Sequence, residues 1–190
     1  MRSMSSDDNA SDPIARTLAL EPLILEYADQ AERERSLPAP VAKAMAKAGL
    51  YRIAAPESFQ GEACDPATQI KTIEAISKAD GATGWNLMIG IESFGLISVN
   101  FPYGQTLFAA PIAILSSSTA AVGKAEAAEG GYRVSGDWQF VSGCHNCDFF
   151  GGLVAPCKNG EPLGQAPASQ ASASYSYCLL YTSPSPRDRG

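Results

Sequence analysis

The period of the hydrophobic pattern changes once along this 190-residue chain, near Pro102, and this change fixes the order of the structural elements. Before Pro102, apolar residues recur at intervals of three and four, which is typical of helices with one buried face. After it, short apolar runs and alternating residues follow, which is typical of strands. Because the helices come first and the strands second, the sequence predicts an α+β fold and not an interleaved α/β one.

Local signals place the ends of the predicted helices. Asp-Pro pairs at positions 12–13 and 65–66 each combine a capping carboxylate with a proline at the first helical position, where no amide hydrogen is needed. A helix over residues 40–48 is expected to stop at Gly49. The last helix, over residues 82–99, is apolar almost all round, so we expect it in the middle of the helical domain.

Three strands are predicted after Pro102. The first covers residues 112–118 and the third covers residues 149–155. Between them, after a turn at residues 130–131, the segment 132–142 alternates, and a period of two puts every second side chain on the same face. That face carries Tyr132, Val134, Gly136, Trp138, Phe140 and Ser142.

Charge and hydropathy exclude several classes of partner. The net charge is −6 without any run of like charges, so no surface for nucleic acid is expected. Residues 1–12 are polar and lack the apolar core of a signal peptide. The apolar stretch over residues 87–99 is interrupted by polar and glycine residues and is too short to span a membrane. A cytoplasmic protein with neither a nucleic-acid nor a membrane partner is therefore predicted.

The five cysteines, an odd number without an export signal, are expected to be free thiols. Cys144 and Cys147 form a C-x-x-C pattern around the only histidine, His145. Tetrahedral zinc normally needs four such ligands, and a redox C-x-x-C normally opens a helix, whereas this one follows a predicted strand. No metal site is predicted, and His145 is interpreted as a polar loop residue.

Two blocks of sequence carry a resemblance to a known family: DGATGW at residues 80–85 and GYRVSGDWQFVSGC at residues 131–144. Both resemble the acyl-CoA dehydrogenase superfamily, in the branch that also contains two-component flavin-dependent monooxygenases. The resemblance covers about residues 18–162. It implies a helical N-terminal domain, a middle β-barrel and a C-terminal four-helix bundle, with the flavin, FAD or FMN, between the barrel and the bundle. We therefore expect a multidomain α+β fold that contains the helical domain and the first strands of the barrel and lacks the C-terminal bundle.

Four regions of the chain are predicted: a disordered N-terminus at 1–12, a helical domain at 13–110, a partial β-barrel domain at 111–164, and a low-complexity tail at 165–190. The tail is rich in Ala, Ser, Pro, Gln and Tyr and shows no period, so no regular element is expected there. Its residues 178–188 resemble a translated sequencing adapter. We interpret the tail as such an artefact, in preference to a disordered tail.

The resemblance also assigns residues to a cofactor site. It places Phe140 at an aromatic position and Ser142 at a hydroxyl position beside the flavin. A flavin ring needs a flat apolar wall and hydrogen-bond partners along one edge, and two residues two apart on a strand can supply both. Ser118 and Thr119 are further candidate flavin contacts. The alternatives are that Phe140 belongs to the barrel core and that the three hydroxyls only cap strand ends.

Residues 116–123 fall where the dehydrogenases carry a Thr-Glu-Pro-x-x-Gly-Ser loop that touches flavin and substrate. In this chain Ala120 and Ala121 replace Glu and Pro. The change disfavours an acyl-CoA substrate, and the Ser-rich version resembles the hydroxylase branch better.

Glu92 and Ser93 lie on the helix over residues 82–99, which is expected to be buried, so both polar groups must find partners there. In the monooxygenase-like branch this helix passes near the substrate pocket. Both residues are therefore candidates for that pocket, and the alternative is a satisfied structural polar pair.

The sequence thus predicts a truncated flavin-dependent oxidoreductase resembling acyl-CoA dehydrogenases. The first alternative is the oxygenase component of a two-component flavin-dependent hydroxylase, and the second is a non-catalytic helical interaction module. The implied partners are an acyl-CoA or an aromatic or polycyclic substrate, a flavin reductase, and three further copies in a homotetramer of the intact protein. No catalytic residue is named because the catalytic base of the dehydrogenases lies in the C-terminal bundle, and the fragment itself is expected to be inactive.

Overall fold

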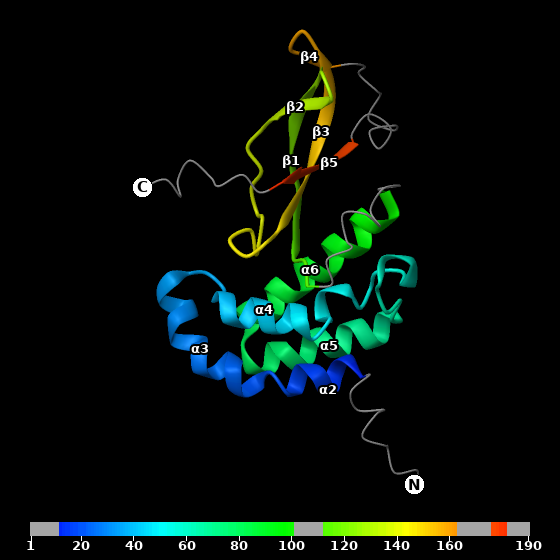
Figure 1. Cartoon of the computed structure of the whole chain (residues 1–190). Coiled ribbons are helices and arrows are strands. Elements are labelled where there is room, and N and C mark those ends of the chain that lie inside the picture. The colour runs from blue at the N-terminus through cyan, green and yellow to red at the C-terminus, as the bar shows by residue number, and fades with distance from the viewer. Residues whose placement is uncertain (1–11, 101–111, 163–175, 182–190) are drawn as a thin grey trace.

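The computed structural model describes residues 12–100, 112–162 and 176–181, and it shows a layer of helices on which a narrow sheet stands (Figure 1). The predicted order of helices followed by strands is confirmed. The helical elements are α2 (Pro13–Leu18), α3 (Glu21–Glu34), α4 (Ala39–Lys47), the short 3₁₀ turns η1 (Leu50–Arg52) and η2 (Glu57–Phe59), α5 (Pro66–Ala79) and α6 (Gly81–Asn100). The strands are β1 (Leu115–Ala128), β2 (Gly131–Ser135), β3 (Phe149–Lys158), β4 (Glu161–Pro162) and β5 (Ser176–Tyr181).

The predicted helix ends are confirmed by the capping geometry. Asp12 accepts a hydrogen bond from the amide of Ile14 at the start of α2. Asp65 accepts from the amides of Ala67 and Thr68 at the start of α5. Gly49 adopts the left-handed conformation just after α4, with φ of 73°, a conformation that a glycine reaches without steric cost.

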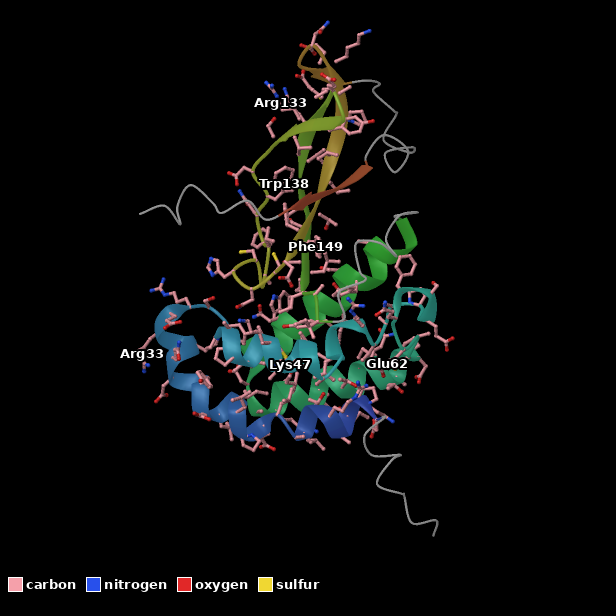
Figure 2. The ribbon with its side chains drawn as sticks, in the orientation of Figure 1. Arg33, Lys47, Glu62, Arg133, Trp138 and Phe149 are labelled. Carbon is pink, nitrogen blue, oxygen red and sulfur yellow. The ribbon has the colours of Figure 1, made fainter. Side chains whose placement is uncertain are left out.

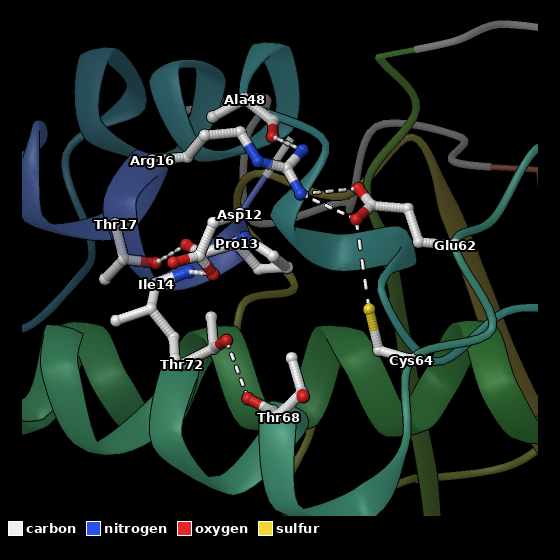
Figure 3. A network of polar contacts seen from close by, with 10 residues as sticks. All are labelled: Asp12, Pro13, Ile14, Arg16, Thr17, Ala48, Glu62, Cys64, Thr68 and Thr72. Carbon is white, nitrogen blue, oxygen red and sulfur yellow. Dashed lines mark hydrogen bonds and ion pairs between the residues drawn. The ribbon is translucent and has the colours of Figure 1, made fainter. Parts of the chain in front are cut away.

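One arginine ties two helices and a loop together (Figure 3). Arg16 on α2 donates from Nη2 to both carboxylate oxygens of Glu62, at 2.7 and 2.6 Å, and from Nη1 to the carbonyl of Ala48 at 2.6 Å. Hydrogen bonds between charged groups are shorter and stronger than those between neutral groups. The pair therefore fixes α2 against the end of α4 and against the loop that leads to α5.

Helix α6 lies between the two halves of the molecule. It packs against α5 and η1 on one side and against β1 on the other, and Leu87, Ile91 and Phe94 are buried in the core. The expectation that α6 lies in the middle is confirmed, but burial all round is wrong. Trp85, Glu92 and Leu96 are exposed, and with half-buried Ile89 they follow one another at intervals of four, three and four, along one face of the helix.

The strands form one mixed sheet in the order β2-β1-β3-β4, with β5 paired to β3. β1 and β2 are antiparallel and joined by a tight turn at Gly130, whereas β1 and β3 are parallel. The register between β1 and β3 shifts between Ser118 and Val122, so residues 119–121 bulge out of the ladder. Such bulges bend a strand and re-aim its side chains.

The predicted strand over residues 132–142 is corrected by the structure. β2 ends at Ser135, residues 136–141 are irregular, and residues 142–146 form a turn. We call residues 136–142 the tethered loop, because the hydroxyls of Ser116 and Ser118 on β1 donate to the carbonyls of Ser142 and Gln139, at 2.6 and 2.5 Å. Those carbonyls accept side-chain hydrogen bonds, and a regular ladder does not continue there.

The prediction that the tail carries no regular element is wrong for residues 176–181, which form β5 antiparallel to β3. The predicted disorder of residues 1–11 concerns residues outside the described ranges, and the interpretation of the tail as an adapter artefact stays a prediction. In the described part of the chain, no helix is long and apolar enough to cross a membrane.

Candidate functional site

A hollow of about 230 Å³ opens between α6 and β1, next to the bulge of β1. It brings together five of the six predicted site residues: Ser118, Thr119 and Phe140 of the flavin set, and Glu92 and Ser93 of the substrate set. Apolar side chains complete the wall. The full lining is Ile89, Glu92, Ser93, Leu96, Ser117, Ser118, Thr119, Ala120 and Phe140.

The floor of the hollow is a pair of hydroxyls. Ser93 is buried, and its Oγ lies 2.8 Å from Oγ of Ser117, with either oxygen able to donate. The pair links α6 directly to β1. The neighbouring Glu92 is exposed at the rim, so the expectation that its carboxylate is buried is wrong, whereas the burial of Ser93 with a polar partner is confirmed.

The bulge of β1 forms one wall of the hollow. The Ser118 hydroxyl donates to the carbonyl of Gln139 and accepts from the amide of Ala120 at 3.2 Å. Because a hydroxyl has only one hydrogen to donate, Ser118 can offer a ligand only its remaining lone pair. Thr119 is exposed in the bulge, so its hydroxyl is the better placed of the two for a ligand. A flavin contact by either residue stays a prediction.

Phe140 projects from the tethered loop at the mouth of the hollow, and its side chain is 82% exposed. Its backbone is left-handed, with φ of 59°. This conformation costs a bulky residue about 1–2 kcal/mol. Two serine hydrogen bonds, from Ser116 and Ser118, flank it in the chain, and such a bond typically contributes about 0.5–1.5 kcal/mol net. The two bonds are therefore of the right size to offset the strain.

Ser142 does not share a face with Phe140, contrary to the prediction. It lines an adjacent hollow next to the end of α3, and its Oγ accepts a hydrogen bond of 2.9 Å from Nε1 of Trp85 on α6. An indole N–H only donates, so the hydroxyl hydrogen of Ser142 remains available for another acceptor. Trp85 and Ser117 are site residues that the sequence reasoning missed. The DGATGW block at residues 80–85, which ends at Trp85, was the signal for the first, and the Ser-rich segment over residues 116–123 was the signal for the second.

Trp138 anchors the first part of the tethered loop on the sheet. Trp138 donates from Nε1 to the carbonyl of Leu153 at 3.0 Å, and its ring meets Phe150 edge-on with centroids 5.6 Å apart. A Cβ added at Gly152 would lie 2.7 Å from Trp138 Nε1, so this glycine leaves the room that the indole occupies. Figure 2 shows Trp138 alongside the sheet and Phe149 at its base, where the sheet meets the helices.

The C-x-x-C turn joins the sheet to the helical layer. His145 Nδ1 lies 3.0 Å from the hydroxyl of Ser36, and Asn146 donates to the carbonyl of Leu37 at 2.7 Å. Burial raises the pKa of the Cys147 thiol to about 12, while Cys144 is exposed. A high pKa disfavours the reactive thiolate at neutral pH. Within the described ranges, no three His, Cys, Asp or Glu side chains are grouped to hold a metal ion.

Comparison with known proteins gives the same family from sequence and from structure. Residues 14–100 match the family described as the acyl-CoA dehydrogenase N-terminal domain. The oxygenase subunit HsaA of a flavin-dependent monooxygenase from Rhodococcus jostii (strain RHA1) is 31% identical over 149 residues, which are 76% of this chain and 38% of the relative. The oxygenase component of an FADH(2)-dependent resorcinol hydroxylase from Rhizobium sp. (strain MTP-10005) is 31% identical over 165 residues, 83% of this chain and 40% of that protein.

Among solved structures, the HsaA monooxygenase from M. tuberculosis superposes with a TM-score of 0.73 at 26% identity, and the match covers 90% of this chain and 43% of that one. The chain belongs to the acyl-CoA dehydrogenase superfamily. Within it, the similar relatives are oxygenase components of flavin-dependent monooxygenases. The chain spans about 40% of the length of the resorcinol hydroxylase component that it matches.

The residues around the hollow fit one edge of a flavin ring. The exposed ring of Phe140 offers an aromatic surface, Ile89 and Leu96 offer apolar flanks, and Thr119 offers a hydroxyl at the bulge. Pockets that enclose a whole cofactor or drug-sized ligand usually measure roughly 300–1,000 Å³, and this hollow is smaller. The described residues can therefore hold the edge of a planar ring, but they do not enclose a complete FAD or FMN.

Proposed function

We propose that this chain supplies the helical domain and part of the flavin wall of an oxygenase component in a two-component flavin-dependent monooxygenase. The observation that carries the proposal is the hollow between α6 and β1, where Phe140, Thr119 and Ser93 meet although they are far apart in the sequence. The similarity to HsaA and to the resorcinol hydroxylase component supports it. A bound reduced flavin would supply the electrons that activate O₂.

The chain's own residues would position the flavin and keep water away from it. Phe140 would lie against the ring, and the Thr119 hydroxyl would offer a hydrogen bond along its edge. Ile89 and Leu96 would exclude water from the substrate side, because both line the hollow from α6. Glu92 at the rim of the hollow would accept a hydrogen bond from a polar group of the substrate.

The proposal includes partners that follow from a two-component system. A flavin reductase would deliver the reduced FAD or FMN, the substrate would be a small aromatic compound, and the enzyme would assemble as a homotetramer in the cytoplasm. An acyl-CoA dehydrogenase activity is the second candidate. The Ala120-Ala121 sequence at the bulge disfavours it, because this pair replaces the Glu-Pro pair of the loop that the dehydrogenases carry at this place.

The test is an anaerobic titration of the full-length product of the gene that encodes residues 12–162, with FAD and FMN in both redox states. We expect binding of the reduced flavin, and then hydroxylation of a phenol when O₂ is admitted. Phe140→Ala should weaken flavin binding, whereas Tyr132→Ala, which removes another exposed aromatic ring on β2, should not. A protein that binds neither flavin would overturn the proposal, and reduction of bound flavin by acyl-CoA alone would favour the dehydrogenase.

The 190-residue chain by itself is proposed to bind flavin weakly and to be inactive. The reason is the size of the hollow, which accommodates one edge of the ring. Fluorescence titration of the isolated chain with FMN measures this directly, and a micromolar dissociation constant would contradict it.

A further inference from the structure

We propose that Ser116 and Ser118 are positioning residues: they hold the tethered loop across β1 and thereby fix Phe140 in the left-handed conformation that presents its ring to the hollow. The holding of the loop is a property of the chain itself. The consequence for a bound flavin rests on the proposed function.

Successive side chains of β1 point to opposite faces of the strand, so the serines at 116–118 make two separate sets of contacts. Ser116 and Ser118 are two apart, so they point to the same face of the strand, and both are buried. Their hydroxyls reach the carbonyls of Ser142 and Gln139. Ser117 points to the opposite face and pairs with Ser93 on α6. Three consecutive serines therefore bind two different partners, the loop on one face and the helix on the other.

The two tethers flank Phe140 directly. Gln139 precedes it, and Ser142 follows it by two positions. The Phe140 ring is mostly exposed, so burial of the ring contributes little to its placement. A left-handed backbone at a bulky residue persists only where the surroundings hold it, and the buried hydroxyls of Ser116 and Ser118 are the contacts that do so on either side.

Two other contacts hold the tethered loop, and neither of them holds the backbone at Gln139. Trp138 is fixed to the carbonyl of Leu153, and the side chain of Ser142 is fixed by Trp85. These contacts hold the two ends of the loop, and the Ser118 tether lies between them. With alanine at positions 116 and 118, the carbonyls of Gln139 and Ser142 would lose these donors, and the loop would gain other conformations.

The first experiment measures the loop in the 190-residue chain. Chymotrypsin cleaves after exposed aromatic residues, so its cleavage rate at the Phe140–Val141 bond reports how often the loop opens. We expect Ser116→Ala and Ser118→Ala each to raise this rate roughly fivefold, because loss of one buried hydrogen-bond partner changes an equilibrium by about that factor. Ser117→Ala, which removes a hydroxyl from the same strand but breaks the contact with α6, should change the rate by less than about twofold. Equal rates for all three variants and the unaltered chain would overturn the proposal.

The second experiment measures FMN affinity in the full-length gene product. Ser118→Ala should weaken FMN binding, and Ser118→Thr, which keeps the hydroxyl, should restore it. Thr72→Val serves as the control for stability: it removes a buried hydroxyl-to-carbonyl bond in α5, so it should lower the melting temperature without changing FMN affinity. If Phe140→Ala weakens binding and Ser118→Ala does not, the positioning role is wrong. If FMN does not bind the unaltered protein, the proposed function fails, and the cleavage rates still decide whether the serines hold the loop.

Discussion

The helical layer and the sheet are held together by different means. The helices bury a continuous apolar core, and four residues from the base of the sheet join it: Ala113, Ile114, Leu115 and Phe149. Farther up the sheet, the buried apolar side chains in the described strands are few and small, namely Ala125, Val154 and Cys157. The sheet is stabilised instead by backbone hydrogen bonds between its strands, by the serine hydroxyls, and by the contacts of Trp138 with Leu153 and Phe150. The part that carries the candidate site is thus the part with the least apolar burial, where local opening costs least.

The comparison predicts that, when the two halves are separated, the helical one folds cooperatively and the sheet does not. A polypeptide of residues 12–100 should unfold cooperatively and retain helical circular dichroism, because most of the core lies within it. A polypeptide of residues 112–162 should lack a cooperative transition, since its strands bury little on their own. Thermal melts followed by circular dichroism test both. A stable sheet polypeptide, or an unfolded helical one, would break the comparison.

Within the helical layer, Leu87→Ala should be strongly destabilising. Leu87 is fully buried on α6, and truncating such a side chain typically costs about 2–5 kcal/mol in the free energy of unfolding. The control is Leu25→Ala on α3, where the side chain is 55% exposed, and its effect should stay within about 0.5 kcal/mol. Urea unfolding of the two variants gives both values. Similar losses in the two would show that the core is not where the structure places it.

The boundary between the halves can be probed through the start of α6. Asp80 accepts a hydrogen bond of 2.6 Å from the amide of Thr83, which makes it the capping residue of the helix that touches both halves. Asp80→Ala should lower the free energy of unfolding by about 1 kcal/mol, and Asp80→Asn should cost much less, because asparagine caps nearly as well. Equal losses in the two variants would assign the effect to charge instead of capping.

At neutral pH the smallest effect is expected at the junction itself, because this effect develops only in alkaline solution. Burial raises the pKa of Cys147 from 9.0 to about 12, so the folded state keeps a proton that the unfolded state releases. The stability from this group is fully present below the unfolded pKa and is lost as the pH rises toward the folded one. Between about pH 9 and 12, the unfolding free energy should therefore fall more steeply in the unaltered chain than in Cys147→Ala.

Local chemistry made most of the helical layer predictable. The Asp-Pro pairs at residues 12–13 and 65–66 satisfy helix starts by contacts within three residues, so the sequence around them is sufficient. The exposure of Glu92 was not predictable in the same way. An apolar helix such as α6 gives no sign of which face will be left outside until the neighbouring elements are in place.

The sheet was harder to predict because its decisive contacts are distant in the sequence. Alternation over residues 132–142 is real, but Ser116 and Ser118 bind the carbonyls of the tethered loop from more than twenty positions away, and the strand stops at Ser135. The parallel pairing of β1 with β3 has no local signal at all. The site residues came from family resemblance, and their meeting in one hollow required the packing of α6 on β1.

The hydrogen bonds of His145 and Asn146 to the turn after α3 span 109 positions of sequence. A ribosome adds roughly 5–20 residues each second, so these contacts have to wait roughly 5–20 s after their partners Ser36 and Leu37 have been made. In the last part of that interval, after α6 has been made, the helices are present while the end of α3 still lacks these two contacts. The end of α3 is thus fastened to the sheet only after residues 145 and 146 have been added.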